Sequence, residues 1–241
     1  MKISVEEPAF NEERLLAGSL AAIRSAMRAF DEAGWDCELV VCDNNSSDRT
    51  AEIARAAGAS VVFEPVNQIA RARNAGAARA SGDWLLFVDA DSYPSRELFL
   101  EVIAAIRGGR ALAGGATVVF EIRNPVIRLW IGLWNALSRR ARWAAGSFIF
   151  CEAAAFRELG GFDERFYAGE EVDFSRRMKR LARRRGREMV ILHRHPLATS
   201  NRKARLYTMR EFFAFMLKTL LTGGRTLRDR KACYTWYDGR R

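Results

Sequence analysis

Short apolar runs alternate with helical stripes along the first half of the chain. The runs have the length of buried strands, and apolar positions recur every three or four residues between them. The predicted strands are Ile3–Val5, Cys37–Cys42, Ser60–Phe63 and Trp84–Val88. The predicted helices follow Asn11 and span Asp48–Ala57 and Asn67–Ala80. This alternation predicts an α/β fold with a doubly wound, mostly parallel sheet and helices on both faces.

The second half of the chain is less regular. Its predicted strands are Gly114–Ile122, Gly146–Cys151 and Glu188–Leu192. An acidic cluster, Gly169–Asp173, opens a basic helix that runs to about Arg185, and its carboxylates suit the positive end of the helix dipole. A last amphipathic helix, Arg202–Leu221, precedes a basic tail over residues 226–241.

The helix predicted over Val126–Leu137 carries two tryptophans. Trp130 and Trp134 are four residues apart, so both indoles lie on one helix face. We expect one of them to pack in the core. The other is expected to stack on a sugar or to face a membrane.

Polar residues collect at the carboxyl ends of three predicted strands, at Pro8–Glu12, Asp43–Asp48 and Asp89–Asp91. Open α/β sheets bind their ligands at this edge. Asp89 and Asp91 would repel each other unless a cation lay between them. Mg²⁺ or Mn²⁺ prefers oxygen ligands and bridges to substrate phosphates. The pattern therefore predicts a metal–diphosphate site, although Asp-x-Asp taken alone also fits a solvated acidic turn.

The formal net charge of +10 indicates an anionic partner, which is a nucleic acid, a nucleotide or an acidic membrane surface. The basic residues gather in the second half, away from the predicted crevice, which favours the membrane surface over a nucleic acid. The four cysteines form no CxxC pair, which fits a reducing compartment. Without a signal core or an apolar run of ~18 residues, we expect a cytoplasmic protein, peripheral on the inner face of the plasma membrane.

Two common nucleotide motifs are missing from the sequence. No GxGxxG follows the first strand, which argues against a dinucleotide cofactor, and no GxxxxGK[ST] is present, which argues against a P-loop enzyme.

Four motifs, in order, resemble those of the family 2 glycosyltransferases, which have the GT-A fold. They are PAFNEE (8–13), VVCDNNSSDRT (40–50), ARARNAGAARASGDWLLFVDAD (70–91) and GGFDERFYAGEEVDFSRR (160–177). The resemblance implies a Rossmann-like GT-A catalytic domain over residues 1–200, with a nucleotide-binding half (1–110) and an acceptor-binding half (111–200). Residues 201–241 would form a C-terminal helix and tail that associates with a membrane.

The resemblance also implies which residues bind the donor. The backbone of Pro8 and Ala9, with Glu12 and Asp43, would hold the base and ribose, and the Asp43 carboxylate can accept the N3–H of a uracil. Arg71 would lie over the donor, and Asn74 is expected to be structural. Three further donor-binding residues are implied at Asp89, on the ribose side or on the metal, and at Arg202 and Lys203, which would clamp the diphosphate.

The metal ligands implied by the resemblance are Asp89, Asp91 and His195, with His193 as the alternative histidine. The implied general base is Glu171, with Glu170 and Asp173 as its rivals. Two departures from the family pattern stand out. Glu6 and Glu7 occupy the end of the first strand, where the family is apolar, and two adjacent carboxylates are costly to bury. At the base position, the family's Asp is replaced by Glu171.

The expected function is metal-dependent, inverting transfer of a sugar from a UDP- or GDP-type donor to an acceptor hydroxyl on a sugar or lipid-linked glycan. Glu171 would deprotonate that hydroxyl. Helix Arg202–Leu221 and the basic helix Asp173–Arg185 would hold the protein on an anionic membrane, and no nucleic acid is expected as a partner. The alternatives are a nucleotidyltransferase of sugar phosphates and a basic nucleic-acid-binding protein.

Overall fold

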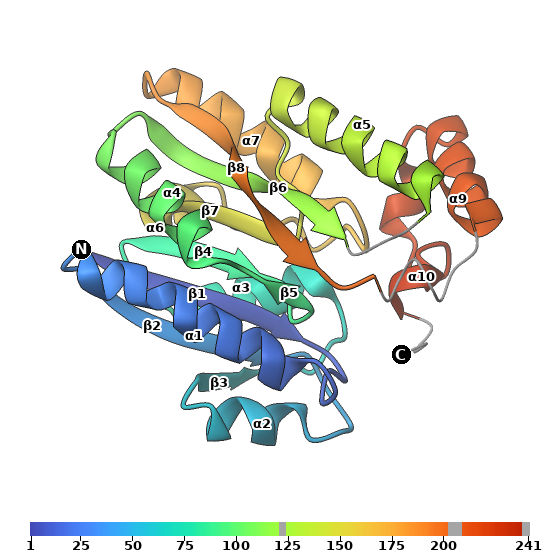
Figure 1. Ribbon diagram of the computed structural model, residues 1–241. Helices are drawn as coiled ribbons and strands as arrows, with labels where there is room; N and C mark the ends of the chain where they lie inside the picture. Colours follow the sequence, from blue (N-terminus) through green and yellow to red (C-terminus); the bar gives the residue numbers. More distant parts are fainter. Residues whose placement is uncertain (121–123, 202–208, 238–241) are drawn as a thin grey trace.

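The computed structural model describes residues 1–120, 124–201 and 209–237 (Figure 1). The strands are β1 (Lys2–Ala9), β2 (Asp36–Asp43), β3 (Ser60–Phe63), β4 (Trp84–Val88), β5 (Ser92–Tyr93), β6 (Ala111–Phe120), β7 (Phe148–Glu152) and β8 (Glu188–Thr199). The longer helices are α1 (Leu16–Glu32), α3 (Ile69–Arg79), α4 (Arg96–Arg107), α5 (Pro125–Ala141), α7 (Glu170–Arg184) and α9 (Met209–Leu221). The shorter ones are α2 (Thr50–Ala56), α6 (Ala153–Glu158), the 3₁₀ turn η1 (Arg225–Arg228) and α10 (Tyr234–Tyr237).

The described strands form one eight-stranded sheet in the order β3-β2-β1-β4-β7-β6-β8-β5. β3, β2, β1 and β4 run parallel to one another, as the alternating pattern predicts. The order reverses at β1, because the chain adds β2 and β3 on one side of it and β4 on the other. This reversal places the carboxyl ends of β1, β2 and β4 next to one another.

The second half of the sheet is mixed. β7 runs antiparallel to both β4 and β6, while β6 and β8 are parallel. The predicted α/β fold with a mainly parallel, Rossmann-like first half is therefore confirmed. The antiparallel β7 joins the two predicted halves into one sheet.

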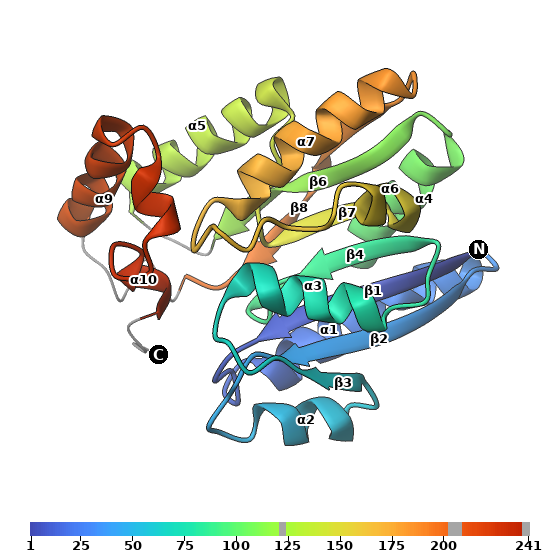
Figure 2. The same ribbon diagram turned by 180° about the vertical axis from the view of Figure 1, so that it is seen from behind.

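Two apolar clusters hold helices on opposite faces of the sheet. On one face, α1 and α4 meet over Phe30 and Phe99, whose ring centroids are 5.0 Å apart. On the other face, Phe87 of β4 packs edge-on against Phe162 at 5.2 Å, and Phe174 of α7 stacks beside it. Figure 1 is seen from the α1 and α4 side, and Figure 2 from the α3 and α7 side.

β8 extends past the predicted strand Glu188–Leu192. It continues to Thr199, but its register with β6 jumps between the pairs Ala116–Leu192 and Val118–Leu197. Residues 193–196, which include Pro196, therefore bulge out of the ladder, as expected for a residue that cannot donate a backbone N–H.

Other boundaries also differ from the prediction. α1 begins at Leu16, well after Asn11, whose φ is +52° and whose Oδ1 accepts a hydrogen bond from the Ser47 N–H. Of the predicted last helix, the part from Met209 to Leu221 is observed, and residues 202–208 lie outside the described residues. The described part of the predicted tail folds as η1 and α10.

In the part of the chain that the structure describes, no helix is long and apolar enough to cross a membrane.

Candidate active site

The polar strand ends predicted from the sequence meet at one edge of the sheet. Ala9 pairs with Asp43 at the ends of β1 and β2, and Glu6 pairs with Phe87 on β4. Asp89 follows β4 directly, so it reaches the same edge. The register of the parallel strands thus brings the predicted donor-binding segments together.

Backbone and side-chain hydrogen bonds hold the segment around Pro8 and Ala9 in place. The Ala9 carbonyl accepts from the Asn44 N–H at 2.8 Å, and the buried Asp43 accepts from the Ser46 N–H at 3.1 Å. The buried Glu12 donates its backbone N–H to the Thr50 hydroxyl. These contacts fix the loops after β1 and β2 against each other, with Ala9 and Asp43 paired at the ends of the two strands.

Arg73 on α3 joins the two halves of the site. Its guanidinium donates to Glu170 at 2.6 Å, to Asp89 at 2.9 Å and to the Gly146 carbonyl at 2.8 Å. Only 2% of the Arg73 side chain is exposed. Burial opposes its charge, but the carboxylates of Asp89 and Glu170 outweigh this and hold the pKa of Arg73 above its ordinary value.

The sequence interpretation missed Arg73 and chose Arg71 instead. α3 buries Ala70, Arg73, Gly76 and Ala77, which are spaced as one helix face. Arg73 is the charged residue on that otherwise small and apolar face. A charge in that position requires a buried partner, and this signal could have identified it.

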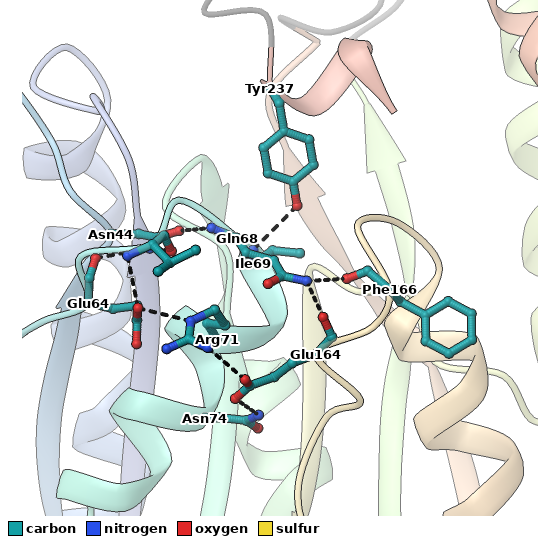
Figure 3. Close-up of polar contacts among 10 residues, drawn as sticks. Asn44, Glu64, Gln68, Ile69, Arg71, Asn74, Glu164, Phe166 and Tyr237 are labelled. Carbon is teal, nitrogen blue, oxygen red and sulfur yellow. Dashed lines mark hydrogen bonds and ion pairs between the residues drawn. The ribbon is translucent and has the colours of Figure 1, made fainter. Parts of the chain in front are cut away.

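Arg71 lies in a different polar network, shown in Figure 3. It forms ion pairs with Glu64 at 3.0 Å and with Glu164 at 2.9 Å, and about a third of its side chain is exposed. Its neighbour Asn74 exchanges hydrogen bonds with both backbone groups of Phe162 and also donates to Glu164. The structural role expected for Asn74 is thus consistent with its contacts.

The same network continues to the C-terminal segment. Asn44 accepts from the Gln68 N–H, and the Gln68 amide donates to the carbonyls of Glu164 and Phe166 (Figure 3). Tyr237 of α10 accepts from the Ile69 N–H and donates to the Tyr167 carbonyl. α10 is thereby fastened to the start of α3.

Glu171, the predicted general base, is half-buried at the start of α7. A Cβ built at Gly146 would lie 3.3 Å from Nη2 of Arg73 and 3.6 Å from Cδ of Glu171, so the glycine allows both side chains to approach. Burial raises the pKa of Glu171 to about 8, and the negative charges of Glu170 and Asp89 act in the same direction.

The other two carboxylates at the start of α7 already have partners. Glu170 is bound by Arg73, and Asp173 pairs with Arg177 at 2.6 Å. Arg177 also donates to the carbonyls of Leu159 and Gly161. Glu170 and Asp173 therefore have structural contacts, which leaves Glu171 as the candidate base.

Asp91 is hydrogen-bonded to Ser200, which directly follows β8. Ser200 donates its hydroxyl to Asp91 at 2.8 Å and its backbone N–H to the Asp91 carbonyl at 2.9 Å. His195 lies elsewhere, because the bulge of residues 193–196 turns it toward α4. There, Nδ1 of His195 is 2.7 Å from Glu101. The structure therefore does not bring His195 to Asp89 and Asp91, and the predicted set of three metal ligands is not assembled.

The remaining donor set still fits a hard divalent cation. Within the described residues, no group of three or more His, Cys, Asp or Glu side chains could hold a metal by itself. Mg²⁺ and Mn²⁺ are commonly bound by one or two carboxylates together with substrate phosphates. Asp89 and Asp91, both half-buried beyond β4, provide those oxygens. Arg202 and Lys203, the predicted diphosphate clamp, lie outside the described residues.

Glu6 and Glu7 are fully buried, and β1 continues through them to Ala9. Their side chains lie on opposite faces of the strand, Glu6 against Gly76 of α3 and Glu7 near Ser19 of α1. None of their carboxyl oxygens has a hydrogen-bond partner among the described residues. Burial therefore raises the pKa of both carboxyls well above the ordinary value, and Arg73 only partly offsets this for Glu6.

Comparison with solved structures identifies the fold. The mannosyltransferase PcManGT from Pyrobaculum calidifontis, solved with GDP-Man and Mn²⁺, has a TM-score of 0.61 and 18% identity over 81% of this chain and 56% of its own. Glucosyl-3-phosphoglycerate synthase from Mycobacterium tuberculosis, with Mn²⁺, UDP-glucose and phosphoglyceric acid, has a TM-score of 0.61 and 21% identity over 88% of this chain and 77% of its own. The chain thus has the GT-A fold of nucleotide-sugar glycosyltransferases.

The family model described as "Glycosyl transferase family 2" matches residues 4–159. The dolichol-phosphate mannosyltransferase of Pyrococcus furiosus is 32% identical over 127 residues, which cover 49% of this chain and 34% of that protein. The chain belongs to glycosyltransferase family 2, and the predicted family is confirmed. It spans about a third to a half of the length of the first curated relatives that it matches.

Proposed function

We propose that the chain is a metal-dependent, inverting glycosyltransferase that moves a sugar from a UDP- or GDP-type donor to an acceptor hydroxyl. The observation that carries this proposal is the position of Arg73, which binds Asp89 beyond β4 and Glu170 at the start of α7. Arg73 thereby connects the Asp89–Asp91 segment, whose carboxylates suit a metal-bound diphosphate, with the segment that carries Glu171, whose pKa is raised. Family membership supports the reaction class.

The nucleoside of the donor is proposed to lie between the loops after β1 and β2. Asp43 can accept the N3–H of a uracil, and Glu12 with the backbone of Pro8 and Ala9 would contact the ribose and base. Arg71 is proposed to lie over the donor, with its ion pairs to Glu64 and Glu164 orienting the guanidinium.

Asp89 and Asp91 are proposed to hold Mg²⁺ or Mn²⁺ together with the donor diphosphate. When bound, the metal supplies positive charge that stabilises the departing diphosphate. Arg202 and Lys203 are proposed to add charge-assisted hydrogen bonds to the same group.

In the proposed reaction, Glu171 accepts the proton of the acceptor hydroxyl. The oxygen forms a bond to the anomeric carbon from the side opposite the diphosphate, and the bond from that carbon to the diphosphate breaks. Arg73 holds the Glu170 side chain beside Glu171 through their ion pair, so it acts as a positioning residue. A base with a pKa of about 8 accepts a proton more readily than an ordinary carboxylate.

The acceptor is proposed to be a sugar or lipid-linked glycan presented at an anionic membrane surface, with the protein peripheral on the inner face of the plasma membrane. The positive net charge supports an anionic surface. The predicted halves, residues 1–110 and 111–200, are proposed to bind donor and acceptor respectively.

Calorimetric titration of UDP and GDP, with Mn²⁺ and with EDTA, tests the metal and donor parts. We expect binding that requires the metal and that Asp91→Asn abolishes. His195→Ala is the matched control, and its affinity should stay within about a factor of two, as for other exposed substitutions. Equal affinity in Mn²⁺ and EDTA would overturn the metal-dependent proposal.

Glu171→Gln tests the catalytic part. Transfer should fall by roughly two to four orders of magnitude, the usual value of a general base, while Mn²⁺-dependent donor binding survives. The control is Asp173→Asn, which removes a carboxylate that pairs with Arg177 instead. Near-native turnover of Glu171→Gln would show that another group is the base.

A further inference from the structure

Helix α5 exposes most of its apolar side chains, although it lies against β6 and β8. Among its residues, only Ser138 is buried. Five large apolar residues within about three turns of the helix, each with another member three or four positions away, form one exposed row, here called the α5 stripe. They are Val126, Leu129, Trp130, Leu133 and Leu137, with exposed fractions of 53%, 63%, 44%, 51% and 47%. Trp134 instead packs against the core, as expected for one of the two tryptophans.

The stripe leads to a cationic pocket at the C-terminal end of α5. Arg140 follows Leu137 by three residues, so it continues the same helix face. The pocket has a volume of about 330 Å³. It is lined by Arg140, Arg142, Lys179, Arg183 and Arg187, with Glu188 as its acidic residue. α5 and α7, which supply most of these cations, lie side by side in both views (Figures 1 and 2).

The cations of this pocket are only partly neutralised by the protein. Arg142 pairs with Glu188 at 2.9 Å, and Arg187 pairs with Glu152. Lys179 donates to the Ala141 carbonyl at the end of α5. Burial lowers the pKa of Lys179, and the neighbouring guanidiniums of Arg183 and Arg142 lower it further. An anion in the pocket would relieve this repulsion.

We propose that the α5 stripe and the cationic pocket together dock on an anionic lipid bilayer, with the stripe among the acyl chains and a lipid phosphate in the pocket. Apolar helix faces flanked by Lys and Arg bind membrane interfaces in this way. The inference rests on the membrane-side acceptor proposed above and assigns the surface that reaches it. It replaces α9 as the main contact and retains the basic residues of α7.

Charge favours a bilayer over a second copy of the chain. α5 contains no acidic residue, and its exposed polar positions include Arg128, Arg139 and Arg140. A second copy placed on this helix would bring the same cations to the contact, and like charges facing each other suppress association. An anionic surface complements both the stripe and the pocket.

Sedimentation with vesicles tests the proposal. The full chain should bind vesicles of phosphatidylcholine with phosphatidylglycerol, and should bind phosphatidylcholine alone far more weakly. Raising the salt from ~0.1 to ~0.5 M should weaken binding, because it shortens the Debye length. Equal binding to both vesicles, or binding to neither, would overturn the proposal.

Two matched pairs of variants locate the surface. Leu133→Gln should lower vesicle affinity about tenfold, as expected for losing one inserted Leu, whereas Leu100→Gln on α4 should not. The double variant Arg140→Glu/Arg183→Glu should lower affinity for anionic vesicles by about an order of magnitude or more. Arg28→Glu/Arg55→Glu makes the same charge change on α1 and α2 and should bind much more nearly like the parent. Equal losses within either pair would contradict the assigned surface.

Two further measurements separate this proposal from its alternatives. Light scattering should show the same oligomeric state for the parent and Leu133→Gln, and a dimer broken by that change would assign the stripe to a second copy. Mn²⁺-dependent UDP or GDP binding should be unchanged in all four variants. In the parent chain, absence of vesicle binding with intact donor binding would reject only the membrane surface, whereas vesicle binding without Mn²⁺-dependent donor binding would reject the donor chemistry.

Discussion

At the residue scale, the pKa of Glu171 depends on its burial and on charges both adjacent to it and distant from it in sequence. Its raised pKa of about 8 follows from burial and from the charges of Glu170 and Asp89. Since a general base must be ionised, kcat/KM for the donor should rise with pH through about 8 and level off above it. The measurement is a pH–rate profile.

Glu170→Gln should shift this pH–rate profile in a defined direction. Removing the negative charge of Glu170 lowers the pKa of Glu171, and it also frees Arg73 to act on Glu171. The rise in kcat/KM should therefore move to lower pH. A shift to higher pH would contradict the assignment of Glu171 as the titrating base.

Glu7 gives a second prediction, on stability. The pKa of Glu7 is raised in the folded state. The contribution of Glu7 to the stability of the protein is therefore greatest below about pH 4.5 and is lost as the pH rises through the folded pKa. Glu7→Met should raise the free energy of unfolding near pH 8 by about 1–3 kcal/mol, the cost of an unpartnered buried polar group. Denaturant unfolding at pH 5 and pH 8 measures the change and the reduced pH dependence.

Glu38 on β2 is the control of opposite sign. Burial raises its pKa, but hydrogen bonds from Lys2 and Ser4 outweigh this and lower the pKa to about 2. Its stabilisation is therefore present above about pH 4.5 and is lost as the pH falls. Glu38→Met should destabilise the protein near pH 8, and a gain there would contradict this account.

At the element scale, Arg73 connects α3 to the loop after β4, the loop before β7 and the start of α7. Arg73→Lys keeps the charge but cannot donate to Asp89, Glu170 and the Gly146 carbonyl at once. Breaking such a buried pair costs about 3–5 kcal/mol, so the denaturation midpoint should fall clearly. Arg79→Lys, at the end of the same helix, should leave it nearly unchanged.

A double-mutant cycle measures how strongly Arg73 is coupled to Glu170, one of its two carboxylate partners. Combining Arg73→Lys with Glu170→Gln should cost less than the sum of the single changes, because the second change removes the carboxylate left unpaired by the first. Additive losses would show that Arg73 and Glu170 do not act together.

At the scale of the whole molecule, the halves predicted to bind donor and acceptor share one sheet. β4 from the first half pairs with β7 from the second, and β5 pairs with β8. A fragment of residues 1–110 would expose the β4 edge and the apolar face of Phe87. We expect this fragment not to fold alone, whereas the full chain should lose far-UV and near-UV circular dichroism in one transition. A folded fragment with native-like spectra would contradict this.

Local patterns were sufficient for the first half of the fold and for the edge that carries the site. The strands and helices up to Val88 follow from apolar periodicity, and the polar residues Asp43 and Asp89 follow from their position at strand ends. The choice of Glu171 follows from the family resemblance and from its position at a helix start. These features depend on residues close in sequence, and parallel strands necessarily bring their carboxyl ends together.

Only the tertiary structure decided what these residues touch. Pairing between distant segments buries Glu6 and Glu7 and places Arg73, rather than Arg71, beside Asp89. It also creates the β8 bulge that turns His195 away from Asp91. The exposed α5 stripe also depends on which helix face the sheet leaves uncovered. Periodicity in the sequence predicts that a helix face is apolar. Long-range packing determines which part of the protein covers that face and how much of it stays exposed.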